Sequence, residues 1–241
     1  MLLEPQPVYR ARSLEERYAP RAHTPDELAI WYTEDYMRQL IVNADDFGYS
    51  PGVNRGLIEA HQKGIVTSTS VMVDAVAARK AAELSKYPAL SVGLHFVPDG
   101  TERVAEALDK QFQKFISICG SAPTHIDIHK DTSPKEAVLA YAAERGIPAR
   151  YSGQAKFIDS FFGSHSGGDV SVARLKQAID EATDEVNEIM CHVGYLDDYL
   201  QTHSAYNDLR EAELRSICDP VIKAYISSEG LQLINWTHIN Y

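Results

Sequence analysis

Short apolar runs alternate with longer segments of helical periodicity along most of the chain, from residue 37 to its end. This alternation is typical of repeated strand–helix units built around a parallel sheet. The apolar runs predict about seven strands, over residues 40–44, 69–73, 90–95, 124–129, 148–151, 188–192 and 231–236. We therefore expect an α/β fold in which helices cover a parallel sheet.

Helix boundaries are clearest after the first and fourth of these strands. Residues 51–63 begin with Pro51 and are followed by Gly64, and residues 134–145 show the same order of proline and glycine. Proline in the first turn and glycine just past the last turn are typical helix boundary residues. Such units can close into a barrel related to the (β/α)₈ type or form an open, doubly wound sheet, and periodicity does not distinguish the two.

The first 36 residues have a different composition. They contain four of the eleven prolines and many acidic residues. The run Thr24-Pro25-Asp26-Glu27 is a typical helix start and predicts a short helix to about residue 36. We expect residues 1–36 to be an N-terminal appendage to one main domain, residues 37–241, with Met37 as an alternative start of the functional chain.

The charge of the chain narrows the classes of ligand. With 34 acidic against 23 basic residues, the formal net charge is −11. Such a chain is repelled by nucleic-acid phosphates and anionic lipids, so we expect neither nucleic-acid nor membrane binding. No apolar stretch reaches the ~18 to 20 residues of a membrane helix, and no signal-peptide pattern is present, which favours a cytoplasmic location. A metal ion or a small neutral or cationic ligand fits this charge best.

Polar residues that can carry chemistry stand where predicted strands end. The carboxyl ends of parallel strands meet at one side of an α/β fold, where active sites form. Asp45 and Asp46 close the first strand, His95 the third, His129 the fourth and His192 the sixth. We therefore expect these side chains to lie close together.

Two adjacent carboxylates at the mouth of a buried strand repel each other unless a cation or a shared proton intervenes. A metal ion beside Asp45 and Asp46 would remove this repulsion. The alternative is that one of them caps the helix that begins near Pro51 and that the other is solvated.

The fourth strand alternates strictly, with His125, Asp127 and His129 on one face and isoleucines on the other. A polar inner face suits a barrel that holds a site, whereas a solvated edge strand would show the same pattern. His95 alone would be a core histidine. Together with Asp46 and His129 it forms an Asp/His/His set, which is typical of a metal site with one position open to water.

His192 ends an apolar strand before a turn of small residues, which favours a functional role. Arg150 stands at the end of the fifth predicted strand. Its guanidinium could orient a carboxylate, contact a substrate or form a structural ion pair.

Five motifs in order resemble the YdjC/ChbG-like carbohydrate deacetylase family. They are LIVNADDFGYSPGVNRGLIEA from residue 40, GIVTSTS from residue 64, and then VGLHF, PTHIDIH and MCHVGY. The resemblance extends from about Met37 to the end of the chain and does not include residues 1–36.

The resemblance implies an irregular (β/α) barrel related to polysaccharide deacetylases, which removes the N-acetyl group of amino sugars such as chitooligosaccharides with a divalent metal. By motif, Asp46, His95 and His129 match the metal ligands, Asp45 the catalytic base and His192 the catalytic acid. The residues expected to line the substrate site are Arg150, Tyr195 and His125.

Two departures from the family leave the substrate open. The stretch between His95 and Thr124 is shorter than in chitooligosaccharide-acting relatives, and Lys130-Asp131 replaces further histidines. The alternatives are a metal-dependent hydrolase or isomerase of another sugar derivative, or a non-catalytic sugar-binding relative. The ligand types favour Zn²⁺, and an oxygen-rich site would accept Mg²⁺. We expect a small carbohydrate as the partner of the protein. Residues 1–36 could mediate a homodimer or cover the site.

Overall fold

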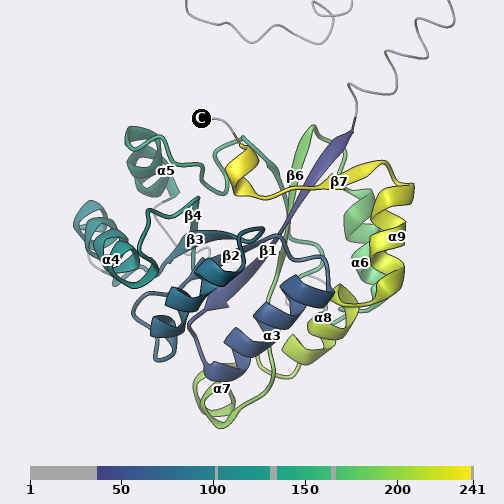
Figure 1. The fold of residues 1–241 in the computed structure, drawn as a ribbon, viewed down its shortest axis with the longest axis horizontal. Helices are drawn as coiled ribbons and strands as arrows, with labels where there is room; N and C mark the ends of the chain where they lie inside the picture. Colours follow the sequence, from purple (N-terminus) through teal and green to yellow (C-terminus); the bar gives the residue numbers. More distant parts are fainter. Residues whose placement is uncertain (1–36, 101–102, 131–134, 164–166, 240–241) are drawn as a thin grey trace, which may run out of the picture. The chain divides into compact units, whose positions relative to one another are not determined.

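Among the described residues after position 36, a curled sheet of seven parallel strands forms the centre of the domain (Figure 1). The computed structural model describes residues 37–100, 103–130, 135–163 and 167–239. Its strands are β1 (Arg38–Phe47), β2 (Ser68–Val71), β3 (Ser91–Phe96), β4 (Ile126–Ile128), β5 (Lys156–Ile158), β6 (Val186–Cys191) and β7 (Leu231–Leu233). The order across the sheet is β4-β3-β2-β1-β6-β5, and β7 pairs with the start of β1. The α/β class and the number of strands expected from the sequence are confirmed.

Side-chain contacts across the sheet show how strongly it curls. A single parallel bridge pairs Ile126 of β4 with Ala149. The next residue, Arg150, donates from Nε to Oε1 of Glu188 on β6, at 3.0 Å. One side chain therefore links the segment beside β4, at one end of the sheet, to β6, the strand next to the other end. In the described residues β4 and β5 do not pair, so the barrel is incomplete.

The predicted fifth strand, residues 148–151, is wrong. Only Ala149 pairs there, because the chain turns at once: the N–H of Ser152 donates to the Ala149 carbonyl, and Tyr151 has a φ of +69°. This left-handed conformation departs from the extended backbone of a regular strand, and the chain turns there instead of continuing to pair. Strand β5 forms later, at Lys156–Ile158, where it pairs with β6.

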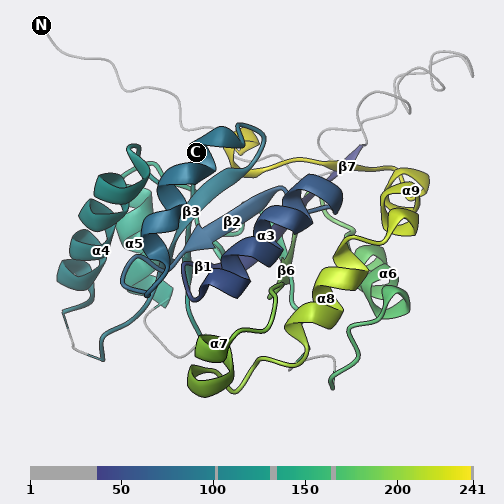
Figure 2. The same ribbon diagram turned by 60° about the horizontal axis from the view of Figure 1, so that its bottom comes forward.

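Helices cover the outside of the sheet (Figures 1 and 2). Ser50 accepts a hydrogen bond from the N–H of Val53 and so caps the helix that begins at Pro51, the predicted first residue. In the part of the chain that the structure describes, the helices are α3 (Pro51–Lys63), α4 (Val104–Cys119), α5 (Lys135–Glu144), α6 (Val172–Asp180), α7 (Asp198–His203), α8 (Arg210–Ile217) and α9 (Pro220–Ser228), with 3₁₀ turns η1 (Ala78–Lys86) and η2 (Trp236–His238). The helices predicted over 51–63 and 134–145 correspond to α3 and α5.

Alternate residues of β1 separate two regions of the core. Leu40 and Val42 belong to the large cluster that packs under the helices, whereas Ile41 packs with Trp236 in a second cluster. Side chains of a strand alternate between its faces, so the inner face of β1 runs from Ile41 through Asn43 to Asp45. The inside of the sheet is thus apolar at one end and polar at the carboxyl ends of the strands.

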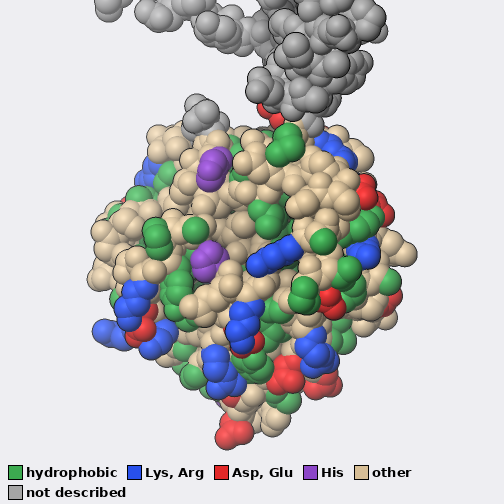
Figure 3. Space-filling model, turned by 45° about the vertical axis from the view of Figure 1, so that its right-hand side comes forward, with side chains coloured by type: hydrophobic (Ala, Val, Ile, Leu, Met, Phe, Trp, Pro, Cys, Tyr) green, Lys and Arg blue, Asp and Glu red, His purple; other side chains and the backbone are tan. Residues whose placement is uncertain are grey.

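The surface carries charged side chains of both signs. On the described part of the face shown in Figure 3, basic and acidic side chains are interspersed, without a continuous basic area. Among the described helices, none is both long and apolar enough to cross a membrane. The appendage predicted over residues 1–36 lies outside the described residues.

Candidate metal centre

A cavity of about 410 Å³ opens at the carboxyl ends of the strands. Strands and the segments after them provide its polar lining, which includes Asp45, Asp46, His95, His129, Arg150 and His192. The structure therefore brings together the five residues that close predicted strands, and Arg150 with them.

A bulge in β1 places both adjacent aspartates on the cavity. The pairing of β1 with β2 shifts between Ala44 and Phe47, and Asp46 has a φ of +73°. In a regular strand, Asp45 and Asp46 would point to opposite faces. Bulges redirect side chains next to active sites, and aspartate enters the left-handed region more readily than most residues. The local backbone is thus shaped for the site.

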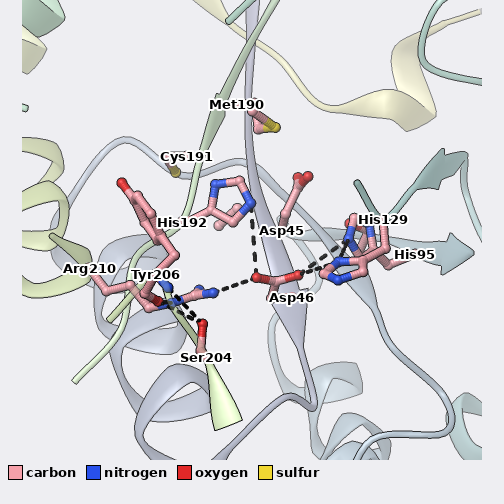
Figure 4. Close-up of polar contacts among 12 residues, drawn as sticks. Asp45, Asp46, His95, His129, Met190, Cys191, His192, Ser204, Tyr206 and Arg210 are labelled. Carbon is pink, nitrogen blue, oxygen red and sulfur yellow. Dashed lines mark hydrogen bonds and ion pairs between the residues drawn. The ribbon is translucent and has the colours of Figure 1, made fainter. Parts of the chain in front are cut away.

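Three ligand atoms of this cavity lie at the spacing of a metal coordination shell (Figure 4). Oδ1 of Asp46 is 3.3 Å from Nε2 of His95 and 3.2 Å from Nδ1 of His129, and the two nitrogens are 3.1 Å apart. Ligands about 2.1 Å from one ion lie about 3.0 to 3.4 Å from each other at angles between 90° and 109°. Asp46 Oδ1 is also buried without a hydrogen-bond donor. These residues fit a single divalent cation.

His95 is oriented by a carboxylate behind it. Its Nδ1–H donates to Oδ1 of Asp127 at 2.6 Å, so Nε2 faces Asp46. Carboxylate–histidine pairs of this kind hold metal-binding imidazoles in one tautomer. Burial alone would lower the pKa of His95, but Asp127 and Asp46 outweigh it and raise the pKa to about 10. A metal ion must therefore displace a proton from His95.

Arg150 is the centre of a buried ion-pair network. Its two terminal nitrogens each donate to one oxygen of Asp45, both at 2.8 Å, and it also contacts Glu188 at 2.8 Å and Asp127 at 3.3 Å. Three roles were considered for Arg150. The geometry supports the one in which its guanidinium orients the Asp45 carboxylate. Burial raises the pKa of Glu188 to about 7 against the opposing effect of Arg150.

When every carboxyl group is ionised and every histidine is neutral, the charges of this buried cluster do not balance. Its carboxylates exceed its guanidinium groups by two, the members being Asp45, Asp46, Asp127, Glu188, Arg150 and Arg210. Buried charge without compensation is costly. One divalent cation, with neutral histidines, would make the cluster neutral.

His192 lies on the other side of Asp46 from the two histidines (Figure 4). Its Nε2 is 3.9 Å from Oδ2 of Asp46, and its ring packs against Phe162 and Tyr206 with centroids 4.4 and 5.6 Å away. Its backbone N–H donates to Glu213 at 2.6 Å. Burial lowers the pKa of His192 to about 4, so the imidazole is neutral near pH 7.

Arg210 was not identified in the sequence. It is the first residue of α8, and its Nη2 lies 2.7 Å from Oδ2 of Asp46. Although burial would raise the pKa of Asp46, Arg210 and the neighbouring imidazoles of His129 and His95 hold it well below its usual range. A helix residue far along the chain carries none of the strand-end signal that identified the other site residues.

Two expected substrate-binding residues are not brought to the cavity. Tyr195 donates its hydroxyl to Glu59 at 2.6 Å, away from the cavity lining. His125 shares the face of Asp127, as the alternation predicted, but it stacks on Trp236 at the apolar end of the sheet, with ring centroids 5.1 Å apart. Its position at the beginning of the strand explains its distance from the carboxyl-end site.

Sequence comparison gives consistent relatives. A family model described as YdjC-like protein matches residues 39–99 and 98–228. A carbohydrate deacetylase of Geobacillus stearothermophilus is 34% identical over 238 residues, which is 83% of this chain and 97% of that protein. A chitooligosaccharide deacetylase of Serratia marcescens is 34% identical over 245 residues, with 80% and 96% covered.

Solved structures share the architecture. A protein of Enterococcus faecalis V583 named for cellobiose-phosphate cleavage superposes with a TM-score of 0.76 at 25% identity, covering 86% of this chain and 100% of that one. A family 4 carbohydrate esterase from Streptomyces lividans gives a TM-score of 0.55 at 14% identity, with 84% and 96% covered. The polysaccharide-deacetylase-like fold expected from the sequence is confirmed.

Proposed function

The chain belongs to the YdjC-like protein family, and we propose that it is a metal-dependent hydrolase that removes the N-acetyl group from an amino sugar or a short chitooligosaccharide. Relatives named carbohydrate deacetylase and chitooligosaccharide deacetylase support the reaction type. The observation that carries the metal dependence is the buried, unpartnered Oδ1 of Asp46 within 3.3 Å of two imidazole nitrogens.

Asp46, His95 and His129 would hold the metal, Mg²⁺ or Zn²⁺. When bound, such a cation polarises an acyl carbonyl and makes water more acidic. Asp127 keeps His95 in the tautomer that presents Nε2 to the centre.

Asp45 is the proposed general base. Arg150 holds both of its oxygens in place, and the carboxylate faces the cavity next to Asp46. Asp45 would remove a proton from the water that attacks the acetyl carbon. A base step of this kind contributes roughly 10²- to 10⁴-fold to the rate.

His192 is the proposed general acid, because an amine leaves only when its nitrogen is protonated. The imidazole is neutral at rest, since burial lowers its pKa to about 4. Its Nε2 must therefore gain a proton during the reaction before it donates one to the amine nitrogen.

Aromatic side chains give the cavity surfaces on which a sugar ring can pack. Rings are provided by Tyr151, Phe157, Phe162 and Tyr206. Their apolar faces next to polar groups are typical of small-molecule sites, and they support a carbohydrate substrate.

The test is acetate release from a panel of N-acetylated sugars, monomer through short oligomer. Metal-stripped protein is resupplied with Mg²⁺ or Zn²⁺, and Asp74→Asn, at an exposed aspartate, is the matched control. We expect metal-dependent release that Asp46→Asn abolishes together with metal binding. Asp45→Asn should keep the metal and lower kcat by roughly 10²-fold or more. Full activity with tight metal binding in Asp46→Asn would contradict the assignment, and silence across the panel with bound metal would favour another sugar derivative.

A further inference from the structure

Arg210 reaches the candidate metal centre from a helix outside the sheet (Figures 1 and 4). Its guanidinium is buried and held from several sides. Nε donates to the carbonyl of Tyr206 at 3.0 Å, and the group packs over the rings of Tyr49 and Tyr206 at 5.8 and 5.6 Å. The remaining contact, from Nη2 to Oδ2 of Asp46, therefore comes from a donor with little freedom to move.

The two oxygens of Asp46 have different surroundings. Oδ2 accepts a charge-assisted hydrogen bond from Arg210 at 2.7 Å, and bonds of this kind are roughly twice as strong as neutral ones. Oδ1 accepts none and faces the nitrogens of His95 and His129. One oxygen is thus occupied by the protein and the other is available.

We infer that Arg210 is a positioning residue that reserves Oδ2 of Asp46, so that Asp46 binds the metal through Oδ1 alone. This inference rests on the metal centre of the proposed function. A carboxylate can bind a cation through one oxygen or two. A second oxygen would occupy a coordination position that a catalytic site leaves open for water or substrate. Arg210 keeps that position free, which accounts for a guanidinium beside a cation site despite the repulsion between them.

The decisive variant is Arg210→Gln. The glutamine amide nitrogen is as many bonds from Cα as Nε of arginine, so it keeps the contact with Tyr206 but does not reach Asp46. Arg215→Gln is the matched control, because Arg215 lies on the same helix and is 70% exposed. Each variant is loaded with Co²⁺, whose visible absorption weakens as the number of ligands rises.

We expect Arg210→Gln to bind one Co²⁺ per chain with weaker visible absorption than the wild type, because the second oxygen of Asp46 joins the shell. Its kcat for acetate release should fall at least tenfold. Arg210→Lys, which restores one charged donor, should move the spectrum back toward that of the wild type. Arg215→Gln should match the wild type in spectrum and activity.

An unchanged spectrum in Arg210→Gln would overturn the inference, and so would complete loss of Co²⁺ from that variant. If the Co²⁺ spectrum of Arg210→Gln differs from that of the wild type but the wild type releases no acetate, the deacetylase function is refuted and the inference stands. A wild-type protein that binds no Co²⁺ would remove both.

Discussion

Asp127 does not line the cavity, yet it controls how His95 faces it. Its Oδ2 accepts a hydrogen bond from Asn43 at 3.2 Å and lies 3.3 Å from Arg150, while Oδ1 accepts the Nδ1–H of His95. A carboxylate accepts from all three donors at once. An asparagine at this position would replace one of the two acceptor oxygens with an NH₂ group, which would face one of these three donors.

We therefore expect Asp127→Asn to bind the metal about 10- to 100-fold more weakly, because the His95 ring loses its fixed tautomer and some of its basicity. Competition with a chelator of known affinity measures this change. Asp74→Asn, at an exposed position, should leave the affinity unchanged. Equal affinities in both variants would mean that Asp127 does not orient the ligand.

At this scale the sequence located the residues that end strands. Asp45, Asp46, His95, His129 and His192 all lie on the cavity, because the carboxyl ends of parallel strands converge. Arg210 could not be found in this way, since it contacts Asp46 from a helix and is separated from it by 164 positions in the sequence. For His125, the alternation predicted the face of the strand on which the side chain lies, but not its position along the strand.

At the scale of elements, the first strand contains a structural feature that the pattern of apolar and polar positions does not predict. The run Leu40 to Ala44 predicted the position of β1, and the strand continues to Phe47. Simple alternation places Asp45 and Asp46 on opposite faces. The bulge that brings both to the cavity has no signature in apolar and polar positions. Likewise, residues 148–151 match a strand in composition, but they turn after Ala149.

Strand β3 depends on the absence of a side chain at Gly93. A Cβ atom there would lie 2.4 Å from Cε1 of His125, whose ring stacks on Trp236. We expect Gly93→Ala to lower the free energy of unfolding by about 1–3 kcal/mol through overpacking. Chemical denaturation measures the change.

The same Gly93→Ala substitution made in a His125→Ala protein tests why the free energy of unfolding falls. With the imidazole removed, the same alanine at position 93 has room, so the two substitutions should not be additive. An equal cost in both backgrounds would show that the ring of His125 is not the obstacle.

At the scale of the whole molecule, two buried carboxyl groups make stability depend on pH. Burial raises the pKa of Glu188 and of Glu213 to about 7, outweighing the hydrogen bonds that Glu213 accepts from Tyr206 and from the N–H of His192. A carboxyl whose pKa is higher in the folded chain stabilises the fold fully below the unfolded pKa of 4.5. That contribution is lost as the pH rises through about 7.

We expect Glu213→Gln to reduce this pH dependence. Between pH 5 and pH 8, the free energy of unfolding of the wild type should fall by about 1–3 kcal/mol more than that of the variant, at 1.36 kcal/mol per pKa unit. Denaturant titrations at the two pH values measure the difference. Glu144→Gln, at an exposed glutamate, should behave like the wild type. Identical slopes in the wild type and Glu213→Gln would contradict the raised pKa.

The central position of β1 has a consequence for the order of events on the ribosome. This strand emerges first among the described strands, yet it pairs with β6 and with β7, which come last among them. Pairings between distant segments form slowly, and an unpaired strand edge favours aggregation. Nascent chains that end before β6 therefore keep one edge of β1 exposed, and the acidic cluster lacks Arg210 until α8 has been made. The centre therefore matures only after α8 has been translated.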